Sequence, residues 1–388
     1  MTCQTVVRRP TSGRTIGMLI LIAGSIVLSL MLGACSGSGS VGGVVGGAVP
    51  EVAFATNSAT NTVSVFSVDK VTGVWTFSGS AATGTGPIAE AVHPSGKFLY
   101  VANATSGSIS AYSIDAATGA LAQIVGSPFA APNLPHTLTI DSTGSFLYAT
   151  TRTTTTPSGT SVLTGFTINA TTGALTPIVQ TPPSSDTATF GLTFAPTTRF
   201  LYAADVASDV MGFVAAATSG VLAPVPGSPF SAGRVPLGIA AHPTGKFVYV
   251  ANSADNNVSA YSVDAATGRL STIAGSPFAT GRGPVVAVIE PTGKFIFVTN
   301  SLDGTVSAYS INAASGILTA LTSSPFITGV GPGVTAVDAT GKFLYVVNVV
   351  DNNISLFLIQ SDGSLTAFVP IQTGAGATSA IAFRAGHS

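Results

Sequence analysis

The chain has 388 residues, a formal net charge of −1 and only 7% charged residues, so it lacks the clustered Lys and Arg that a nucleic-acid partner requires. Its 44 glycines and 23 prolines imply many turns, and no long amphipathic helical stretch is visible. This composition predicts an all-β fold and argues against a helical one.

The first 34 residues are predicted to be a signal peptide. Arg8 and Arg9 lie in a positively charged N-terminal segment, and residues 15–32 are apolar and uncharged. A transmembrane anchor is the alternative, because this stretch is near the shortest that spans a bilayer. The run Leu-Gly-Ala-Cys ending at Cys35 resembles the lipobox of bacterial lipoproteins and favours the signal peptide, since an anchor needs no such cysteine.

Cys35 is the predicted lipidation site. The lipobox resemblance implies cleavage before Cys35 and lipid attachment to it, which makes the membrane an expected partner. Ser36 follows where an aspartate would resemble an inner-membrane retention signal, so we predict the outer membrane, with periplasmic or surface exposure. Residues 35–50, rich in Gly, Ser and Val, are predicted to form a flexible tether. Cys3 is lost with the leader, so the mature domain is expected to have no disulfide.

A segment of the form Phe-Leu-Tyr-Val-Ala-Asn recurs throughout residues 51–388. Its copies start at Val52, Phe98, Phe146, Phe200, Phe247, Phe295 and Phe343. Each repeat holds four apolar segments of strand length, as at 247–251, 258–263, 270–274 and 285–289. Four short strands in each of seven repeats predict one domain, a seven-bladed β-propeller of four-stranded blades.

The two ends of this region are expected to share one blade. The region begins at Val52 with a second strand, and residues 378–383 look like a first strand that lacks its blade. Since the strand before each Gly-Lys turn is expected to be innermost, the C-terminal strand is predicted to pair into the N-terminal blade. This pairing closes the ring and removes free sheet edges. We expect a monomer.

Several recurring polar residues are interpreted as parts of the scaffold. Asp or Asn stands four residues before a glycine at the expected turn between the two outer strands, as at Asp264. This is Asx-turn chemistry, and the alternative of a calcium site is weak because the carboxylates are single and far apart. His93 and His242 occupy a turn position that also accepts Asp, Ala and Glu, so they are predicted to cap turns. No metal is predicted.

Asparagines end five of the second strands. They are Asn57, Asn103, Asn252, Asn300 and Asn348. These strand ends should lie on the same face as the loops that lead into the innermost strands, and we call this the mouth face. Asn252 and Asn300 are therefore candidate ligand-binding residues for a polyhydroxylated ligand, unless each asparagine caps its own turn.

The third repeat and its neighbour depart from the pattern. Residues 153–160 are an insertion, and a Pro-Pro-Ser-Ser run leads to Asp186. Thr151 and Asp205 stand where most repeats have the strand-end asparagine. Because the scaffold does not require such departures, we expect function in this quadrant.

The mouth face supplies the candidate site residues. His136 follows Pro135 at the start of an innermost strand, and Arg234 and Arg282 lie in the equivalent loops of later repeats. The candidate catalytic residues are His136, Asp205 and Arg234. The candidate ligand-binding residues are Arg152, Asp186, Arg282, Asn252 and Asn300.

This set suits two kinds of chemistry. A histidine or carboxylate activates water and a guanidinium stabilises the developing oxyanion, as hydrolysis of a lactone or ester requires. The same groups suit binding of an acidic sugar without reaction. For each residue alone, a solvated loop is the alternative. Glu90 is a further exception, because it lies inside an innermost strand. Its side chain either faces the central channel or finds its hydrogen-bond partners nearby.

Two segments carry a family resemblance. Phe98–Asn103 with 109–121, and Phe247–Asn252 with 258–270, share the pattern F-x-Y-V-A-N followed by S-A-Y-S-x-D-A-A-T-G-x-L. Repeats of this form over residues 51–388 resemble the lactonase family of seven-bladed propellers, which includes 6-phosphogluconolactonase and muconate-lactonising enzymes. Surface-layer and YVTN-type propellers share the repeat.

The resemblance also implies a site. Enzymes of the family are expected to have a Pro-His pair, a Gly-Pro-Arg-His run and an Asn-Glu strand end. Pro135 and His136 match the first. At the second this sequence has Leu237 and Gly238 in place of Arg and His, and at the third it has Ser253 in place of Glu.

These observations predict an envelope-anchored, lactonase-like propeller. Most of the family's site is absent and export separates the chain from cytosolic phosphosugars. We therefore expect a non-catalytic module that binds a ligand, an envelope protein or a glycan. The alternative is a hydrolase that opens an extracytoplasmic sugar lactone, similar to 6-phosphogluconolactonase. The sequence has no G-x-S-x-G, H-E-x-x-H or C-x-x-C motif, and no cofactor is expected.

Overall fold

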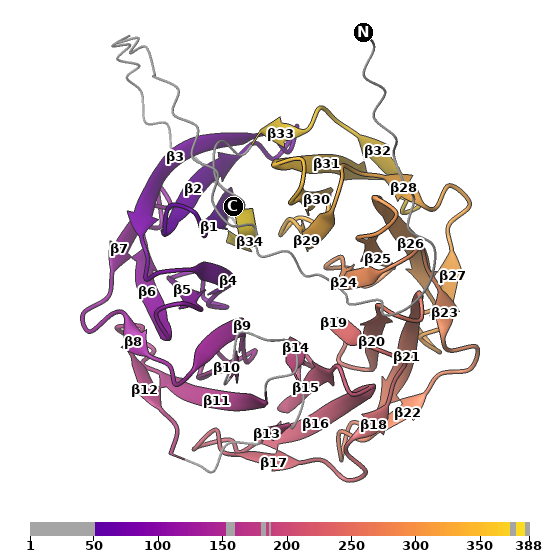
Figure 1. The fold of residues 1–388 in the computed structure, drawn as a ribbon, viewed down its shortest axis with the longest axis horizontal. Coiled ribbons are helices and arrows are strands. Elements are labelled where there is room, and N and C mark those ends of the chain that lie inside the picture. Colours follow the sequence, from indigo (N-terminus) through magenta and orange to yellow (C-terminus); the bar gives the residue numbers. More distant parts are fainter. Residues whose placement is uncertain (1–50, 153–159, 180–183, 186–187, 373–377, 385–388) are drawn as a thin grey trace, which may run out of the picture. The chain divides into compact units, whose positions relative to one another are not determined.

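The computed structural model describes residues 51–152, 160–179, 184–185, 188–372 and 378–384. Their strands form seven antiparallel sheets arranged as blades around a central opening (Figure 1). The described residues contain no helix, and hence none long and apolar enough to cross a membrane. The prediction of an all-β, seven-bladed propeller is confirmed. Residues 1–50, with the predicted signal peptide, Cys35 and tether, lie outside the described residues, as does Asp186.

The first strand of each repeat is innermost, as expected. From blade one to blade seven, the innermost strands are β34 (Thr378–Arg384), β4 (Pro87–Val92), β9 (Leu134–Ile140), β14 (Thr189–Phe194), β19 (Pro236–Ala241), β24 (Pro284–Ile289) and β29 (Pro332–Val337). Their partners are the second strands β1 (Glu51–Asn57), β5 (Phe98–Asn103), β10 (Phe146–Arg152), β15 (Phe200–Asp205), β20 (Phe247–Asn252), β25 (Phe295–Asn300) and β30 (Phe343–Asn348). The second strands are almost wholly buried because a blade covers each face.

The third strands follow the second by hairpins on the mouth face. They are β2 (Thr62–Val68), β6 (Ser108–Ile114), β11 (Ser161–Ile168), β16 (Asp209–Ala215), β21 (Asn257–Val263), β26 (Thr305–Ile311) and β31 (Asn353–Ile359). In blade one the outermost strand is β3 (Trp75–Ala82). In the other six blades it comes as two short pieces, β7 (Leu121–Gln123) with β8 (Phe129–Ala130), β12 (Leu175–Pro177) with β13 (Ser184–Ser185), β17 (Leu222–Pro224) with β18 (Phe230–Ser231), β22 (Leu270–Thr272) with β23 (Phe278–Ala279), β27 (Leu318–Ala320) with β28 (Phe326–Ile327), and β32 (Leu365–Ala367) with β33 (Ile371–Gln372).

The divided outermost strand differs from the single strand expected at 270–274. After β22 the chain leaves β21, passes the cis Ser276-Pro277 bond and pairs with β21 again through β23. Within the loop the hydroxyl of Ser276 accepts a hydrogen bond of 2.9 Å from the backbone N–H of Ala260. Proline has no N–H to give to a ladder, so a serine side chain takes over where strand pairing lapses. Ser127, Ser228 and Ser324 do the same in other blades.

The ring closes through the last strand of the chain. In blade one the strand order is β3-β2-β1-β34, so β34 pairs with β1 although more than 300 residues separate them. Ala53 lies opposite Phe383, and Ala55 lies opposite Ile381. The predicted closure is confirmed. It pairs the backbone of β1 on both sides, so that strand presents no open edge to the centre.

Apolar clusters and one repeated hydrogen bond hold adjacent blades together. Tyr249 of blade five packs with Val298 of blade six inside one such cluster. Its hydroxyl also donates a hydrogen bond of 2.8 Å to the carbonyl oxygen of Gly316, in the outer turn of blade six. Four further tyrosines at this position make the same bond to the next blade, namely Tyr100, Tyr148, Tyr202 and Tyr345.

The turns on the face opposite the mouth are capped as predicted. A carboxylate oxygen of Asp264 accepts hydrogen bonds of 3.1 and 2.8 Å from the backbone of Ala266 and Thr267. His242 lies with Nε2 2.9 Å from the carbonyl oxygen of Gly293, in the corresponding turn of the next blade. Since a carbonyl only accepts, Nε2 is the donor. His93 makes the equivalent contact with Gly144, so both histidines serve the scaffold.

Candidate functional site

Each innermost strand has a β-bulge near its mouth end. The bulge leaves one or two residues out of the regular strand pairing and changes the direction of their side chains. The pairing of β9 with β10 skips His136, and the pairing of β14 with β15 skips Phe190. The other described blades shift register at the same place, leaving Ile88 and Val285 among the skipped residues. A bulged residue turns away from the sheet, and bulges are common beside functional sites. Of these four side chains, only His136 is titratable.

His136, Phe190 and Arg152 form one cluster across blades three and four. The His136 ring meets the Phe190 ring edge to face, with centroids 5.2 Å apart and an interplanar angle of 84°. The guanidinium carbon of Arg152 lies 4.0 Å from the centroid of the Phe190 ring. At this distance the ring attracts the cation. Phe190 therefore contacts both polar groups.

The innermost strands position this cluster through a second contact. The hydroxyl of Thr137 donates a hydrogen bond of 2.5 Å to the carbonyl oxygen of Phe190. This bond joins β9 to β14 directly beside the two bulges. Arg152 ends β10, at a place where the other repeats have small or aliphatic residues such as Ala104 and Ser253. Local strand geometry thus fixes all three side chains.

Burial controls the charge of the cluster. Burial first, and then the positive charge of Arg152, lower the pKa of His136 to about 4. His136 is therefore neutral at pH 7. Burial also lowers the pKa of Arg152, which starts far above neutrality and so remains a cation. The cluster thus carries a single positive charge at neutral pH.

Asp205 lies near this cluster but serves its own turn. It pairs with Thr189, the neighbour of Phe190, and only 2% of it is exposed. One carboxylate oxygen accepts a hydrogen bond of 2.9 Å from the backbone of Ala207. Burial and the charge of Asp205 raise the pKa of Asp209, across the same hairpin. Asp205 thus accepts a hydrogen bond in its turn, whereas the strand-end asparagines donate to side chains of the next strand.

Arg234 and Arg282 lie apart from the cluster, on the rims of blades five and six. Nε of Arg234 is 2.6 Å from the carboxylate of Asp255, and Nε of Arg282 is 2.6 Å from that of Asp303. Their side chains are 73% and 69% exposed. The same aspartates also accept hydrogen bonds from the backbone of the arginines, so each pair ties two loops of one blade together.

Asn252 and Asn300 are buried and occupied by their own hairpins. Nδ2 of Asn252 donates hydrogen bonds of 2.7 and 2.8 Å to the side chains of Asn257 and Ser259. Nδ2 of Asn300 makes the equivalent bonds to Thr305 and Ser307, while its Oδ1 is buried without a partner among the described residues. Both asparagines are 0% exposed. The structure places them inside the scaffold, where a ligand at the mouth does not reach them.

Glu90 lies on β4, which packs against β34 of blade one. It takes the position of Leu138 and Leu192 in the ladders, and both of its carboxyl oxygens are buried without a hydrogen-bond partner among the described residues. Burial raises the pKa of Glu90 well above the usual carboxyl range, and the nearby backbone of Ala382 offsets only part of the rise. Glu90 therefore packs against the closing strand β34.

Phe190 is the site residue that sequence reasoning missed. The signal was present, because Phe190 follows His136 by the same interval that separates the second strands starting at Phe146 and Phe200. A phenylalanine in an apolar strand nevertheless looks like core. Only the bulge, which β-strand alternation does not predict, turns its ring towards the mouth.

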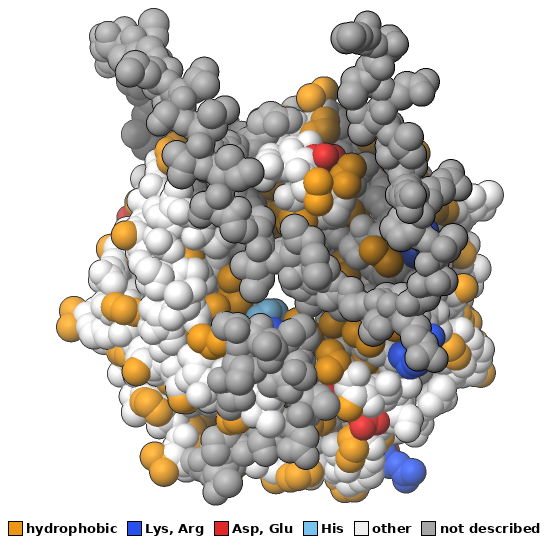
Figure 2. All heavy atoms as spheres, viewed as in Figure 1, with side chains coloured by type: hydrophobic (Ala, Val, Ile, Leu, Met, Phe, Trp, Pro, Cys, Tyr) orange, Lys and Arg blue, Asp and Glu red, His pale blue; other side chains and the backbone are white. Residues whose placement is uncertain are grey.

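The surface offers little other charge or depth. Figure 2 shows few charged side chains on the face in view, and a histidine in the central opening. No three His, Cys, Asp or Glu side chains of the described residues are grouped to hold a metal.

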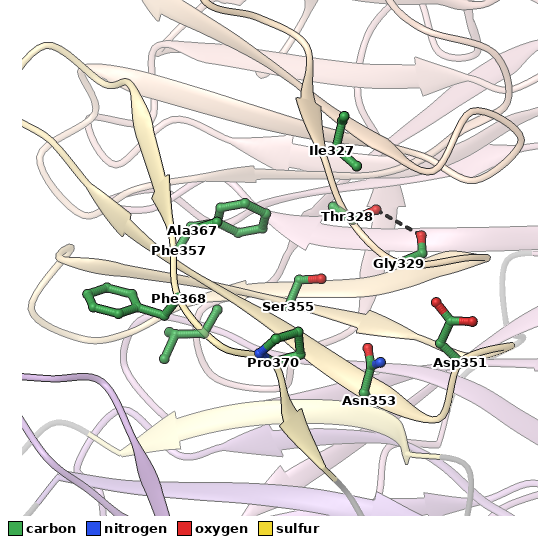
Figure 3. A pocket seen from close by; sticks show the side chains of 11 residues that line it. Ile327, Thr328, Gly329, Asp351, Asn353, Ser355, Phe357, Ala367, Phe368 and Pro370 are labelled. Atoms are coloured by element: carbon green, nitrogen blue, oxygen red, sulfur yellow. Dashed lines mark hydrogen bonds between the residues drawn. The ribbon is translucent and has the colours of Figure 1, made fainter.

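A separate hollow of about 250 Å³ lies between β28 and β31, lined by Ile327, Asp351, Phe357, Phe368 and other residues (Figure 3). Blade seven has Phe357 where blade six has Tyr309, and its outer strand lacks the Ser-Pro loop. The hollow is on blades six and seven, away from the cluster in blades three and four.

Comparison with known proteins agrees with this architecture. Residues 50–135, 187–288 and 238–381 match the family described as Lactonase, 7-bladed beta-propeller. The matched ranges do not include residues 136–186, among which are His136 and Arg152. Among curated proteins, none matches the sequence.

Solved structures show the same fold at low sequence identity. A putative 6-phosphogluconolactonase from Bacteroides uniformis has a TM-score of 0.74 at 19% identity, over 86% of this chain and 99% of that chain. The periplasmic gluconolactonase PpgL of Pseudomonas aeruginosa has a TM-score of 0.74 at 19% identity, over 87% and 99%. The family match extends over well more than half of the chain, and the seven closed blades agree with it. The chain belongs to the lactonase family of seven-bladed β-propellers.

Proposed function

We propose that this lactonase-family propeller is a lipid-anchored envelope protein that binds a small polar ligand at the mouth of blades three and four, without catalysis. One observation carries the proposal. Arg152, a cation of which only 8% is exposed, has two donor nitrogens without a partner among the described residues, and it lies beside the half-buried His136. Unpaired buried donors are costly and rare, and we take this pair as the mark of a ligand site.

The chemistry of the cluster favours binding over hydrolysis. A general base works best with a pKa near the working pH, and the pKa of His136 is about 4. Asp205, the nearest carboxylate by strand pairing, is 2% exposed and caps its turn. The cluster thus holds a donor and a neutral ring but lacks an efficient proton acceptor for water.

Hydrolysis of an extracytoplasmic sugar lactone is the second candidate. It is favoured by membership of the lactonase family and by the likeness to a protein described as a periplasmic gluconolactonase. In that case Arg152 stabilises the oxyanion and His136 is the base.

The two candidates differ in turnover. The full-length protein is titrated with D-glucono-1,5-lactone and D-gluconate by calorimetry, and lactone opening is followed in a pH-stat. The proposal predicts binding that weakens in His136→Ala and Arg152→Gln, with no lactone opening above the uncatalysed rate. Opening that collapses in His136→Ala establishes the second candidate, and absence of any binding refutes both.

Anchoring is tested separately. Cys35→Ala is expected to abolish labelling by palmitate and to release the protein from the membrane fraction into the periplasm. Membrane retention of the unlabelled variant contradicts the lipid anchor and favours a transmembrane segment.

A further inference from the structure

The hollow of about 250 Å³ on blades six and seven lies where blade seven departs from the repeat (Figure 3). At three places around it, blade six has a polar side chain that bonds to another part of the ring, and blade seven has an apolar residue instead. The pairs, blade six first, are Arg282 and Val330, Tyr309 and Phe357, and Ser324 and Val369.

The first replacement leaves Asp351 without a cation. In blade six Nε of Arg282 lies 2.6 Å from the carboxylate of Asp303, in the hairpin beside it. In blade seven the backbone N–H of Val330 still donates to Asp351, at 2.7 Å, but no guanidinium follows. Asp351 lines the hollow and takes part in no salt bridge among the described residues. The predicted tether, residues 35–50, contains no Lys or Arg to replace the missing one.

The loss of a serine leaves a backbone donor open. In blade six the backbone N–H of Ala308 donates a hydrogen bond of 2.9 Å to the hydroxyl of Ser324. Leu356 has the same place in the ladders of blade seven and lines the hollow. Since Val369 has no hydroxyl, the N–H of Leu356 lacks that acceptor.

The loss of a tyrosine leaves a backbone acceptor open. In blade six the hydroxyl of Tyr309 donates a hydrogen bond to the carbonyl oxygen of Ala279, at the outer edge of blade five. Ile327 is the equivalent residue at the outer edge of blade six, and it lines the hollow. Because Phe357 has no hydroxyl, the carbonyl oxygen of Ile327 lacks that donor.

An open donor, an open acceptor and a free carboxylate at one hollow match the groups of a peptide. A peptide backbone supplies the C=O and the N–H, and an arginine side chain supplies the cation that a carboxylate binds best. The volume is below the roughly 300 Å³ at which pockets for whole small molecules begin, so it suits one or two side chains. Ile327, Val350 and Val369 around it are 81%, 62% and 86% exposed, and clustered exposed apolar side chains mark contact surfaces.

We propose that the hollow on blades six and seven binds an extended segment of another protein, in which an arginine lies close to an apolar residue. The guanidinium pairs with Asp351, and the apolar side chain packs against Phe357 and Phe368. Figure 3 shows Asp351 and Phe368 towards opposite ends of the hollow, so the segment runs along it. This surface is separate from the ligand site in blades three and four.

Two peptide libraries test the proposal. The probe is a library of acetylated, amidated pentapeptides with arginine at the centre and mixed residues on both sides. Its control has citrulline at the centre, which keeps the shape of arginine without the charge. The peptides that the immobilised full-length protein retains are measured by mass spectrometry. We expect arginine peptides to be retained about 10-fold or more over citrulline peptides, the size of a charge-assisted hydrogen bond, with apolar residues enriched beside the arginine.

Variants of the rim test where the peptides bind. Val330→Arg copies the ion pair of blades five and six, so it should occupy Asp351 from within the chain and lower the retention about 10-fold or more. Val330 is 58% exposed, so the change leaves the core as it is. Arg282→Val is the matched control. It frees Asp303 in blade six, where the donor and the acceptor remain occupied, and should add no retention.

Three results overturn the proposal. They are equal retention of the two libraries, unchanged retention by Val330→Arg, and no retention of either library. A gain in Arg282→Val as large as the loss in Val330→Arg shows that any free aspartate on the rim suffices, and it also overturns the role of the hollow. Titration with D-gluconate reports on blades three and four, so its outcome is independent of these.

Discussion

The β-bulge in β9 places the imidazole ring of His136, and this placement determines its charge state. The side chain is half-buried beside Arg152, and both burial and the neighbouring cation disfavour the imidazolium. Glu90 shows the same physics with the opposite sign, because burial there disfavours the carboxylate and raises its pKa. In both cases the surroundings in the folded protein, and not the residue type, set the direction of the shift.

The pKa of His136 predicts a pH-dependent stability. The unfolded chain binds this proton below about pH 6.5 and the folded protein only below about 4. The free energy of unfolding should therefore fall as the pH drops from 6.5 to 4, by up to about 3 kcal/mol from this group. His136→Asn should lose that part of the pH dependence. Urea unfolding at pH 7 and pH 4.5 measures it, and an equal drop in both proteins contradicts the assignment.

Glu90→Leu is expected to stabilise the protein. Leucine fills this position in blades three and four, and the change removes a carboxyl group whose oxygens have no partner. We expect a gain of about 1–3 kcal/mol, larger at pH 8 than at pH 5, because the raised pKa of Glu90 makes the native carboxyl cost more as the pH rises. A lower melting temperature at pH 8 than in the unaltered protein refutes this.

At the scale of the element, each blade uses the same devices to meet its neighbour. The innermost strand bulges at the mouth, the second strand is buried on both faces, and in five blades a tyrosine reaches the outer turn of the next blade. In blade six the tyrosine hydroxyl is dispensable, because Phe297 occupies the tyrosine position there and is fully buried. The ring supplies the packing, and the hydroxyl adds one bond.

Tyr249→Phe therefore isolates that bond. The change leaves the buried carbonyl of Gly316 without its 2.8 Å donor while it keeps the ring. We expect a loss of about 1–2 kcal/mol in the free energy of unfolding, with no change in ligand affinity, since blades five and six lie outside the cluster. Denaturant titration is the measurement. A neutral result shows that water takes over the carbonyl.

At the scale of the whole molecule, the ring depends on its closing blade. Arg384, at the end of β34, is 4% exposed and donates hydrogen bonds of 2.9 and 3.0 Å to the backbone carbonyls of Asp115 and Ala116 in blade two. The last strand of the chain thus joins blade one to blade two, besides completing blade one.

Arg384→Ala should weaken this closure. The change removes a largely buried guanidinium that donates to two backbone carbonyls of blade two, which predicts a loss of about 2–4 kcal/mol. Arg269→Ala, an exposed change on an outer turn, should cost less than about 0.5 kcal/mol. Thermal unfolding and limited proteolysis compare the two. Equal melting temperatures contradict a structural role for Arg384.

The sequence by itself determined the scaffold. Seven repeats of four apolar segments predicted the blades, their strand order and the closing strand, because every blade must bury the same faces and so repeats the same residues. The sequence also identified the quadrant of His136 and Arg152 as a departure from the repeat pattern. The two-part outermost strand was not predicted, since a serine hydroxyl replaces strand pairing there.

Only the tertiary structure decided which polar groups are free to bind. Asn252 and Arg234 looked as available as Arg152 in sequence, yet each is held by a partner in its own blade. Among the described residues, Nε and Nη2 of Arg152 have no such partner, and the guanidinium lies against Phe190, a bulged residue of the next blade. Whether a donor is satisfied depends on atoms that folding brings together from different blades, and a repeat pattern carries no record of them.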